Sequence, residues 1–195
     1  MKNPNIPALP DWARVIVDYA ARNAQEEAER LTMLRMIARE GDFLLSRDCT
    51  WAHMTASSMI VSPDRRRTLM AFHRIYNSWA WTGGHNDGDG DFEAVALREA
   101  REETGIDGLR RLGGGIASLE ILPVWAHEKR GAQVGSHLHL NVSFLFEADD
   151  TLPLRVKRDE NSAVGWIDVC SVGRMVTEPQ MIPIYRKLLD RANDC

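Results

Sequence analysis

Cysteine, long apolar runs and a strong charge of one sign are scarce or missing in this sequence. The three cysteines, Cys49, Cys170 and Cys195, are odd in number and widely separated, which indicates incidental thiols in a reducing compartment. No apolar run approaches the roughly 20 residues that span a bilayer. Residues 1–7 also lack the hydrophobic region of a signal peptide. We therefore expect a cytoplasmic protein without a membrane partner.

The charge balance and the length set further bounds. The net charge is −4, and the basic run at residues 65–67 is short, so we expect no binding to duplex nucleic acid. A chain of 195 residues with 44% hydrophobic content can form one domain with appendages. We expect an N-terminal helical extension over residues 1–45 and a larger domain over residues 46–195. The extension either covers an open side of that domain or forms a homodimer contact. A DNA-reading helix-turn-helix has less support, because the segment is not basic.

Apolar periodicity and turn residues predict an alternation of strands and helices. Helices are expected over residues 10–22, 25–40, 92–104 and 182–192. Strands are expected over residues 54–61, 68–75, 79–82, 116–125, 137–147 and 165–169. A helix between strands, with another at the end, fits an α/β fold arranged as an α/β/α sandwich around a mixed sheet.

The segment from Gly83 to Ile106 carries the strongest chemical signal. It places Glu99, Glu102 and Glu103 at spacing i, i+3, i+4, so a helix presents three carboxylates on one face. Carboxylates this close repel one another, and a divalent cation such as Mg²⁺ or Mn²⁺ turns them into a binding site of hard oxygen ligands. The alternative interpretation is an acidic, solvated helix face.

The same segment contains the signals that begin and end this helix. Asp91 is a good N-cap, and Glu93 places a negative charge in the first turn, where the helix dipole favours it. Gly105 lies where a left-handed C-cap belongs. Arg98 precedes Glu102 by four residues and is expected to hold it in place. One face of the helix can therefore pack on a sheet while the other presents carboxylates to a cleft.

These residues resemble the Nudix box, in which a Gly is followed by five residues, a Glu, seven residues and then Arg-Glu-apolar-x-Glu-Glu-x-Gly-apolar. The chain matches the box without insertion or deletion at Gly84, Arg98, Glu99, Ala100, Glu102, Glu103, Gly105 and Ile106. The one departure is Gly90, which occupies the place of the box's first Glu. Residues 52–57, 81–85, 137–140 and 159–161 more loosely resemble one subgroup of bacterial Nudix hydrolases.

The resemblance implies a Nudix hydrolase, a pyrophosphohydrolase that uses Mg²⁺ or Mn²⁺ on a nucleoside diphosphate linked to another moiety. The implied metal ligands are the Gly84 carbonyl, Glu99, Glu102 and Glu103. The implied catalytic residues are Glu102, Glu103 and Arg98, and the general base is either Glu102 or the downstream Glu160. Phosphoryl transfer needs mainly positioning and neutralisation of charge, which divalent ions at such a site supply.

Further polar residues are candidates for contact with a small-molecule nucleotide substrate. They are His85, Lys129, Arg130, His137 and His139. The last two histidines alternate on a strand and leave the same face, His85 follows the metal loop, and the two basic residues suit phosphate. Hydrogen-bonded structure or an ordinary polar loop is the alternative for each. Trp79 and Trp81 favour core packing over stacking on a nucleobase.

Two other functions compete with hydrolysis. One is a non-catalytic Nudix-like module that binds a ligand or regulates, although such modules usually lose the glutamate cluster that is intact here. The other is a metal-dependent isomerase acting on an isoprenoid diphosphate. That chemistry would need a cysteine on a strand beside the box, and Cys49 lies too far upstream in an expected loop.

Overall fold

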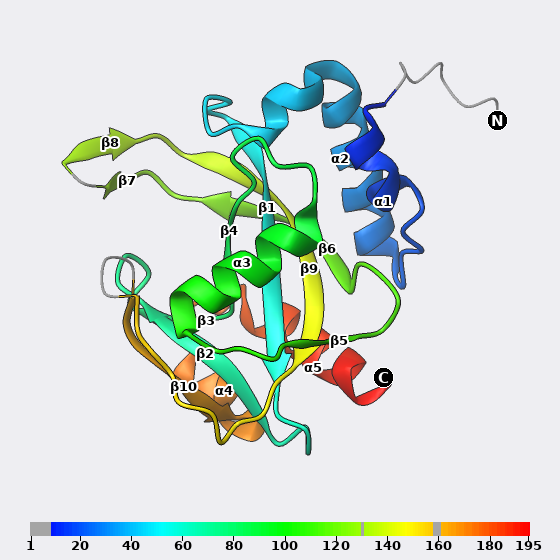
Figure 1. Ribbon diagram of the computed structural model, residues 1–195. Coiled ribbons are helices and arrows are strands. Elements are labelled where there is room, and N and C mark those ends of the chain that lie inside the picture. The colour runs from blue at the N-terminus through cyan, green and yellow to red at the C-terminus, as the bar shows by residue number, and fades with distance from the viewer. Residues whose placement is uncertain (1–8, 130, 158–160) are drawn as a thin grey trace.

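The computed structural model describes residues 9–129, 131–157 and 161–195 and contains a mixed sheet with helices on both of its faces (Figure 1). The helices in these ranges are α1 (Arg14–Val17), α2 (Ala24–Glu40), α3 (Phe92–Thr104), α4 (Val172–Met175) and α5 (Ile182–Asn193), with 3-10 turns at Asp11–Ala13, Gly41–Leu45 and Val169–Ser171. The strands are β1 (Ala52–Val61), β2 (Arg67–His73), β3 (Ser78–Ala80), β4 (Thr82–His85), β5 (Arg110–Leu112), β6 (Ser118–Val124), β7 (His127–Lys129), β8 (Ala132–Val134), β9 (His137–Glu147) and β10 (Asn161–Asp168). The predicted α/β class and mixed sheet are confirmed.

The centre of the sheet is the parallel pair of β1 and β9. Their register runs from Ala52 opposite Leu138 to Val61 opposite Glu147. The eight-stranded sheet has the order β10-β2-β1-β9-β5, with β3 beside β2, β4 beside β1 and β6 beside β9. β1 pairs with β4 along one half and with β2 at the other end. β9 likewise pairs with β6 and then with β5. The central pair is therefore flanked by β4 and β6 at one end and by β2 and β5 at the other.

Alternating side chains give the central strands two different faces. The even-numbered residues of β1 and β9 in the larger apolar cluster are Ala52, Met54, Ala56, Ile60, Leu140, Val142, Phe144 and Phe146. The odd-numbered residues are polar over the first part of both strands: His53, Thr55, Ser57, His137, His139, Asn141 and Ser143. The same face becomes apolar further along, at Met59, Val61 and Leu145.

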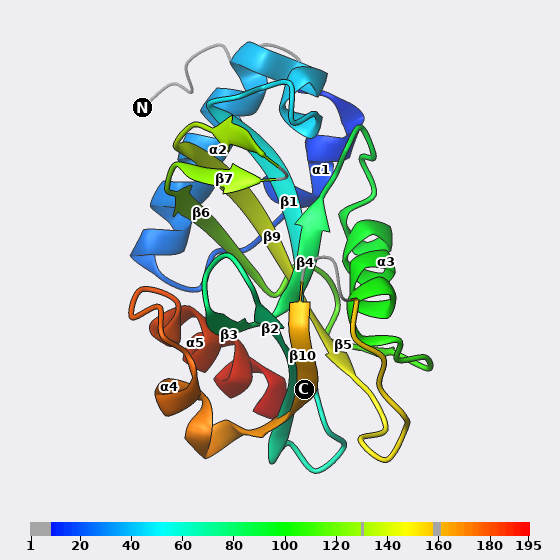
Figure 2. The ribbon, with the colours of Figure 1, turned by 90° about the vertical axis from the view of Figure 1, so that its left-hand side faces the viewer.

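Helices cover both faces, but only one face completely. Figure 2 shows α3 on one side of the sheet and α4 and α5 on the other. Phe92, Val95 and Ala96 of α3 pack in the cluster that contains the even-numbered strand residues. Tyr185 and Leu188 of α5 pack in the second cluster with the apolar end of the odd-numbered face. The polar end of that face is left to line a cleft.

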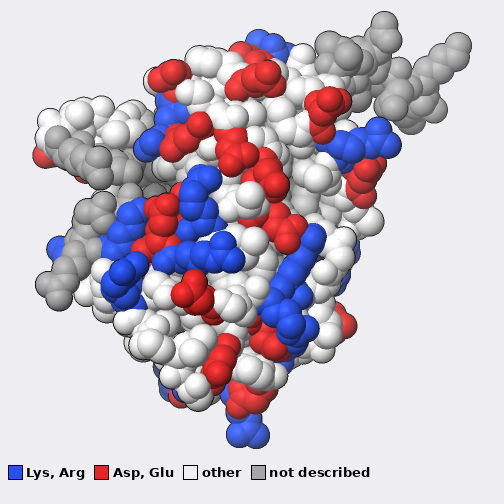
Figure 3. Space-filling model, in the orientation of Figure 1, with Lys and Arg blue, Asp and Glu red and all other residues white. Residues whose placement is uncertain are grey.

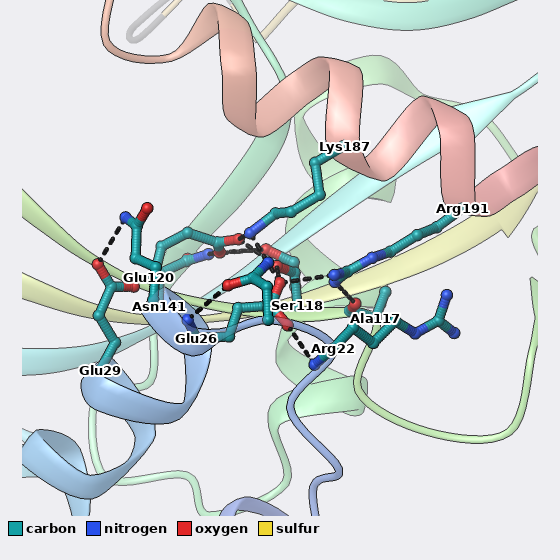
Figure 4. A network of polar contacts seen from close by, with 12 residues as sticks. Arg22, Glu26, Glu29, Ala117, Ser118, Glu120, Asn141, Lys187 and Arg191 are labelled. Carbon is teal, nitrogen blue, oxygen red and sulfur yellow. Dashed lines mark hydrogen bonds and ion pairs between the residues drawn. The ribbon is translucent and has the colours of Figure 1, made fainter.

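The N-terminal helices pack on the same core as the sheet. Ile16, Met33 and Ile37 belong to the larger apolar cluster, and α2 lies against β6. Figure 4 shows that Glu26, near the start of α2, also enters a buried polar network with β6 and α5. Its carboxylate contacts Arg191 (2.7 Å), Lys187 (2.9 Å), the hydroxyls of Tyr19 (2.9 Å) and Ser118 (3.1 Å), and the backbone N–H of Arg22 (3.0 Å).

Two of the differences between the structure and the expected elements lie near the end of α1 and at Trp81. The first helical stretch does not run to residue 22: α1 ends at Val17, and the backbone N–H of Arg22 turns inward to donate to Glu26. The expected strand over residues 79–82 is broken at Trp81, which separates β3 from β4. Trp79 packs on Phe72 with ring centroids 5.6 Å apart, whereas the Trp81 ring lies 5.3 Å from that of Tyr185. Tertiary contacts override the local pattern at both places.

The surface over α3 carries both charges. Figure 3 shows Lys and Arg side chains interspersed with Asp and Glu on this face. Some of them form ion pairs, such as Arg111 with Glu93 at 2.6 Å. Within the described ranges, none of the helices combines the length and apolar character that crossing a membrane requires.

Candidate functional site

The helix that carries the three glutamates is built as its sequence predicts. The Asp91 side chain accepts a hydrogen bond from the backbone N–H of Ala94 at 3.0 Å, which caps the N-terminus of α3. Gly105 has φ 68° and ends the helix in the left-handed conformation. Ala100 and Thr104 are buried on the side that packs on the sheet. Residues 99, 102 and 103 line a cleft on the other side.

Strand β4 brings a glycine backbone directly against this carboxylate face. Its pairing with β1 places Gly84 opposite Ala56 and Gly83 opposite Ser57. A Cβ atom at Gly84 would lie 2.4 Å from Cδ of Glu99, so only glycine allows the carboxylate to approach this closely. The contact places the Glu99 carboxylate against the backbone of Gly84, whose carbonyl is also an expected metal ligand.

Glu103 is the most buried of the three carboxylates, with 5% of the residue exposed. Its Oε1 accepts a hydrogen bond from the backbone N–H of Gly83 at 2.9 Å. Its Oε2 accepts one from the Asn161 side-chain amide at 2.7 Å. An ionised carboxylate has about four lone-pair sites, so these two bonds orient it and leave capacity for a cation.

Glu102 and Arg98 lie differently from the expectation that Arg98 holds Glu102. The Glu102 carboxylate contacts Nζ of Lys157 at 3.2 Å, and 47% of its side chain is exposed. The guanidinium of Arg98 contacts Asp89 at 3.5 Å and Glu99 at 3.6 Å. Arg98 therefore braces the loop before α3 and the neighbouring carboxylate, while Glu102 pairs with Lys157.

These residues fit a divalent cation. The cluster combines carboxylates with a main-chain carbonyl, the oxygen donors that Mg²⁺ and Mn²⁺ prefer. Because Gly84 has no Cβ, the Glu99 carboxylate can lie close to its backbone. The N–H groups of Gly83 and of the Asn161 side chain hold Glu103 in place. Glu99 and Glu103, with the Gly84 carbonyl, would hold the ion, and Glu102 lies at the edge of the same group.

The departure from the box at Gly90 has a steric cause. A Cβ atom at this position would lie 2.8 Å from Cβ of Trp12 in the first 3-10 turn. Trp12 is held there by a hydrogen bond from its Nε1 to Asp42 at 2.8 Å and by an edge contact with Phe92. The N-terminal segment thus occupies the space that a glutamate at position 90 would need.

The three glutamates border a cleft of about 700 Å³. Part of its lining is polar and comes from the odd-numbered side of β1 and β9, including Thr55, Ser57 and Asn141. Tyr76, Trp81, Leu122, Val124 and Val134 add aromatic and apolar surface. The cleft therefore combines a charged edge with a surface on which a flat organic group can pack.

Four histidines gather in this cleft. The parallel register places His53 opposite His139, and β4 places His85 opposite Thr55. The ring centroid of His53 lies 5.0 Å from that of His85, 4.8 Å from that of His137 and 5.0 Å from that of His139. Burial, followed by the neighbouring histidines, lowers the pKa of His139 to about 2, and burial is also the main cause that lowers the pKa of His53.

The structure brings together most of the expected site residues. Gly84, His85, Glu99, Glu102, Glu103, His137 and His139 all line the one cleft. Arg98 lies beside it, while Arg130, Glu160 and the side chain of Lys129 lie outside the described residues. The candidate list from the sequence omitted Lys157, Asn141 and Asn161. Only residue 161 had a signal, through the looser resemblance at residues 159–161.

Comparisons with known proteins identify the family and the fold. A family model described as NUDIX domain matches residues 52–191. A search of curated proteins found no match for the chain.

Several solved structures share the fold at low sequence identity. An Ap4A hydrolase from C. elegans, in a binary complex, is 17% identical, with 73% of this chain and 98% of that chain covered and a TM-score of 0.54. The Nudix hydrolase RenU from M. smegmatis is 17% identical, with 74% and 88% covered and a TM-score of 0.55. The NUDIX domain of Shewanella oneidensis NrtR, complexed with ADP ribose, is 15% identical, with 71% and 86% covered and a TM-score of 0.51.

The family model extends from the first residue of β1 to near the end of α5 and so includes both central strands, the box helix and the cleft. It confirms the resemblance that the box residues indicated. The chain belongs to the NUDIX family.

Proposed function

We propose that this Nudix hydrolase cleaves the pyrophosphate bond of a nucleoside diphosphate linked to another moiety, with Mg²⁺ or Mn²⁺ as cofactor. The observation that carries the proposal is the approach of the Glu99 and Glu103 carboxylates to the Gly83–Gly84 backbone at the edge of the cleft. A bound divalent ion would neutralise charge on the pyrophosphate oxygens and lower the pKa of a water molecule.

The chain's own residues orient that chemistry. The Gly83 N–H and the Asn161 amide hold Glu103 by its two oxygens, so its rotamer is set before any ligand binds. Arg98 contacts Glu99 and restrains it from the opposite side. Glu102 and Glu160 are the two candidates for the general base that accepts the proton of the attacking water.

The rest of the cleft supports a nucleotide-like substrate. Lys157 lies 3.2 Å from Glu102 at the cleft edge, and as a cation it suits a phosphate oxygen. Tyr76 and Trp81 offer aromatic surface for a base or another planar group. The Ap4A hydrolase and the ADP-ribose complex of NrtR are relatives in fold with nucleotide ligands in their names, which agrees with this substrate class.

The N-terminal helices belong to the proposal as a cover of the catalytic domain. We propose that residues 1–45 are a helical extension that supports residues 46–195 rather than a DNA-reading unit. The support is the buried contact of Glu26 with Lys187 and Arg191 of α5. A cytoplasmic location is a further part of this proposal, and a homodimer contact is the alternative role of the same extension.

The test is a screen for hydrolysis of nucleoside triphosphates, nucleoside diphosphate sugars, dinucleotides and coenzyme conjugates, with the phosphate-containing products separated and quantified by chromatography. Each compound is assayed with Mg²⁺, with Mn²⁺ and with a chelator. The matched variants are Glu103→Gln, which removes one charge at the buried ligand, and Glu93→Gln, which changes a carboxylate of the same helix at its first turn. We expect Glu93→Gln to keep its activity and Glu103→Gln to lose at least about 100-fold, because an electrostatic group at the reacting centre is worth several kcal/mol.

Two results would contradict the proposal. One is full activity of Glu103→Gln on every compound that the wild type cleaves. The other is hydrolysis that continues unchanged in the presence of chelator. If the folded chain binds nucleotides but hydrolyses none of them with either ion, the non-catalytic alternative is correct.

A further inference from the structure

The cleft contains a second group of metal-ligand side chains, made of nitrogen donors. His53, His137 and His139 each present a ring nitrogen, and these three atoms lie within 4.8 Å of one another. The pairing of β1 with β9 brings them together, since His53 lies opposite His139 and His137 precedes it on the same side of the strand. None of the three is a box residue.

Two of these rings are held by main-chain carbonyls. Nδ1 of His53 lies 3.1 Å from the carbonyl oxygen of Cys49, and Nδ1 of His137 lies 2.8 Å from that of Gly135. A carbonyl oxygen can only accept, so Nδ1 carries the proton in both rings. The other nitrogen, Nε2, then has a free lone pair when the ring is neutral. This is the arrangement in which a second contact orients a histidine that binds a metal.

The described residues do not supply enough hydrogen-bond donors for the nitrogen lone pairs of these three histidines. Nε2 of His53 has no hydrogen-bond partner within the described ranges. Only 5% of the residue is exposed, so water does not readily replace that partner. Nε2 of His137 lies 3.2 Å from Nε2 of His139. A proton shared between that pair would satisfy His137 and still leave His53 without a partner. An ion among the three nitrogens satisfies all of them.

The dimensions suit an ion of the zinc class. Zn–N distances of 2.0–2.1 Å in a tetrahedron require nitrogens about 3.4 Å apart. The His137–His139 distance of 3.2 Å is already close to this value, and all the ligand atoms lie within 4.8 Å of one another. Small rotations of the rings would complete the geometry. Imidazole nitrogen favours zinc and related transition metals, whereas the glutamate cluster offers the oxygen donors that magnesium prefers.

We propose that His53, His137 and His139 form a three-histidine site for a zinc-class transition-metal ion, separate from the glutamate site and with an open position towards the cleft. The open position follows from the lining of the cleft, which includes all three histidines. Three protein ligands with a free fourth position are typical of catalytic rather than structural zinc sites. An ion here would contact an oxygen of a ligand bound in the same cleft.

The test measures metal binding directly and does not depend on hydrolysis. Untagged full-length protein is titrated with Co²⁺ in millimolar Mg²⁺, and the visible absorption of tetrahedral Co²⁺ is recorded before and after addition of Zn²⁺. We expect one Co²⁺ per chain, displaced by Zn²⁺. His139→Asn and His137→Asn should weaken Co²⁺ binding by at least about 100-fold, since loss of an outer partner alone costs 10–100-fold.

Two control variants separate this site from the rest of the cleft. His73→Ala changes a cleft histidine outside the group, whose ring stacks on Tyr76 at 4.5 Å, and it should leave the Co²⁺ spectrum unchanged. Glu103→Gln removes a ligand of the glutamate site and should also leave the spectrum unchanged. If Glu103→Gln alone abolishes Co²⁺ binding, the ion lies at the glutamates and the inference of a histidine site is wrong, while the proposal of a hydrolase function still stands.

A second measurement covers variants that fail to fold. The thermal midpoint of the wild-type protein should rise when Zn²⁺ is added in excess Mg²⁺, because a ligand that binds the native state alone stabilises it. Absence of that rise, or Co²⁺ binding that is equal in the wild type and in folded His139→Asn, would overturn the proposal.

Discussion

Replacing Glu26 by Gln tests whether the N-terminal helix is tied electrostatically to the catalytic domain. The side chain of Glu26 is 1% exposed and lies 2.7 Å from Arg191 and 2.9 Å from Lys187. Glutamine has nearly the same shape and keeps some hydrogen bonds, but it removes the negative charge. The Arg191 side chain, 7% exposed, would then be buried without its carboxylate partner.

The magnitude follows from the pKa of Glu26. Burial raises this pKa, but the backbone N–H of Arg22 and the contacts with Lys187 and Tyr19 outweigh it and lower the pKa from 4.5 to about 2. One pKa unit corresponds to 1.36 kcal/mol, so the charged form is favoured in the fold by about 3 kcal/mol. Breaking a buried ion pair on one side costs a similar amount, about 3–5 kcal/mol. We expect Glu26→Gln to destabilise the protein by about 3 kcal/mol at pH 7.

The pH dependence has a definite sign. A carboxyl group whose pKa is lower in the folded than in the unfolded state stabilises the fold above its unfolded pKa, 4.5, and this contribution is lost as the pH falls towards 2. At pH 3 the contribution of Glu26 should be about half of its value at pH 7. The difference between the wild type and Glu26→Gln should therefore shrink between these two pH values.

Urea unfolding of both proteins at pH 7 and pH 3 measures these differences. The control is Glu27→Gln, on the next residue. The Glu27 carboxylate pairs with Arg30 at 2.8 Å, and 44% of the Glu27 side chain is exposed. An exposed pair of this kind contributes at most about 1 kcal/mol. Equal stability of Glu26→Gln and Glu27→Gln at pH 7 would refute the reasoning. A difference for Glu26→Gln that is the same at both pH values would refute the assignment to its charge.

Three further predictions concern the site. Gly84→Ala should lower the rate of substrate hydrolysis at least tenfold, because its Cβ would lie 2.4 Å from the Glu99 carboxyl carbon; Gly114→Ala, with no atom within 4 Å of its Cβ, should match the wild type in the same assay. Restoring the box glutamate with Gly90→Glu should destabilise the protein by about 1–3 kcal/mol in urea unfolding, since its Cβ meets Trp12 at 2.8 Å, and unchanged stability would contradict the steric explanation. Dialysis against chelator should abolish substrate hydrolysis and re-addition of Mg²⁺ should restore it; activity that survives dialysis would count against a metal-dependent reaction.

The box helix was predictable from sequence because its signals are local. The N-cap at Asp91 and the left-handed C-cap at Gly105 depend on residues within a turn of each helix end. Strand β9 was expected over residues 137–147 and has these bounds, because polar and apolar residues alternate regularly from His137 to Phe144. Glu99, Glu102 and Glu103 lie on one side of the helix for the same local reason.

Contacts between distant segments were not predictable in this way. The group of His53 with His139 depends on which strands pair and in which register, and periodicity alone does not determine either. The close contact between Trp12 and Gly90 joins segments that are far apart in the sequence. Beyond the early end of α1, the backbone N–H of Arg22 likewise donates to the buried carboxylate of Glu26 in the next helix. In each case the decisive partner lies in another element.

The polar lining of the cleft also has a consequence for how the chain finds its fold. A slip of one residue between β1 and β9 would turn every side chain of one strand to the opposite face. His139, Asn141 and Ser143 would then face α3 in the interior, without the partners that they have now. Such a misaligned sheet would bury several unsatisfied polar groups, each costing about 1–3 kcal/mol. The polar residues on this face of β9 therefore also select the correct alignment of the central strands, and replacing them with apolar residues would remove a safeguard against misfolding.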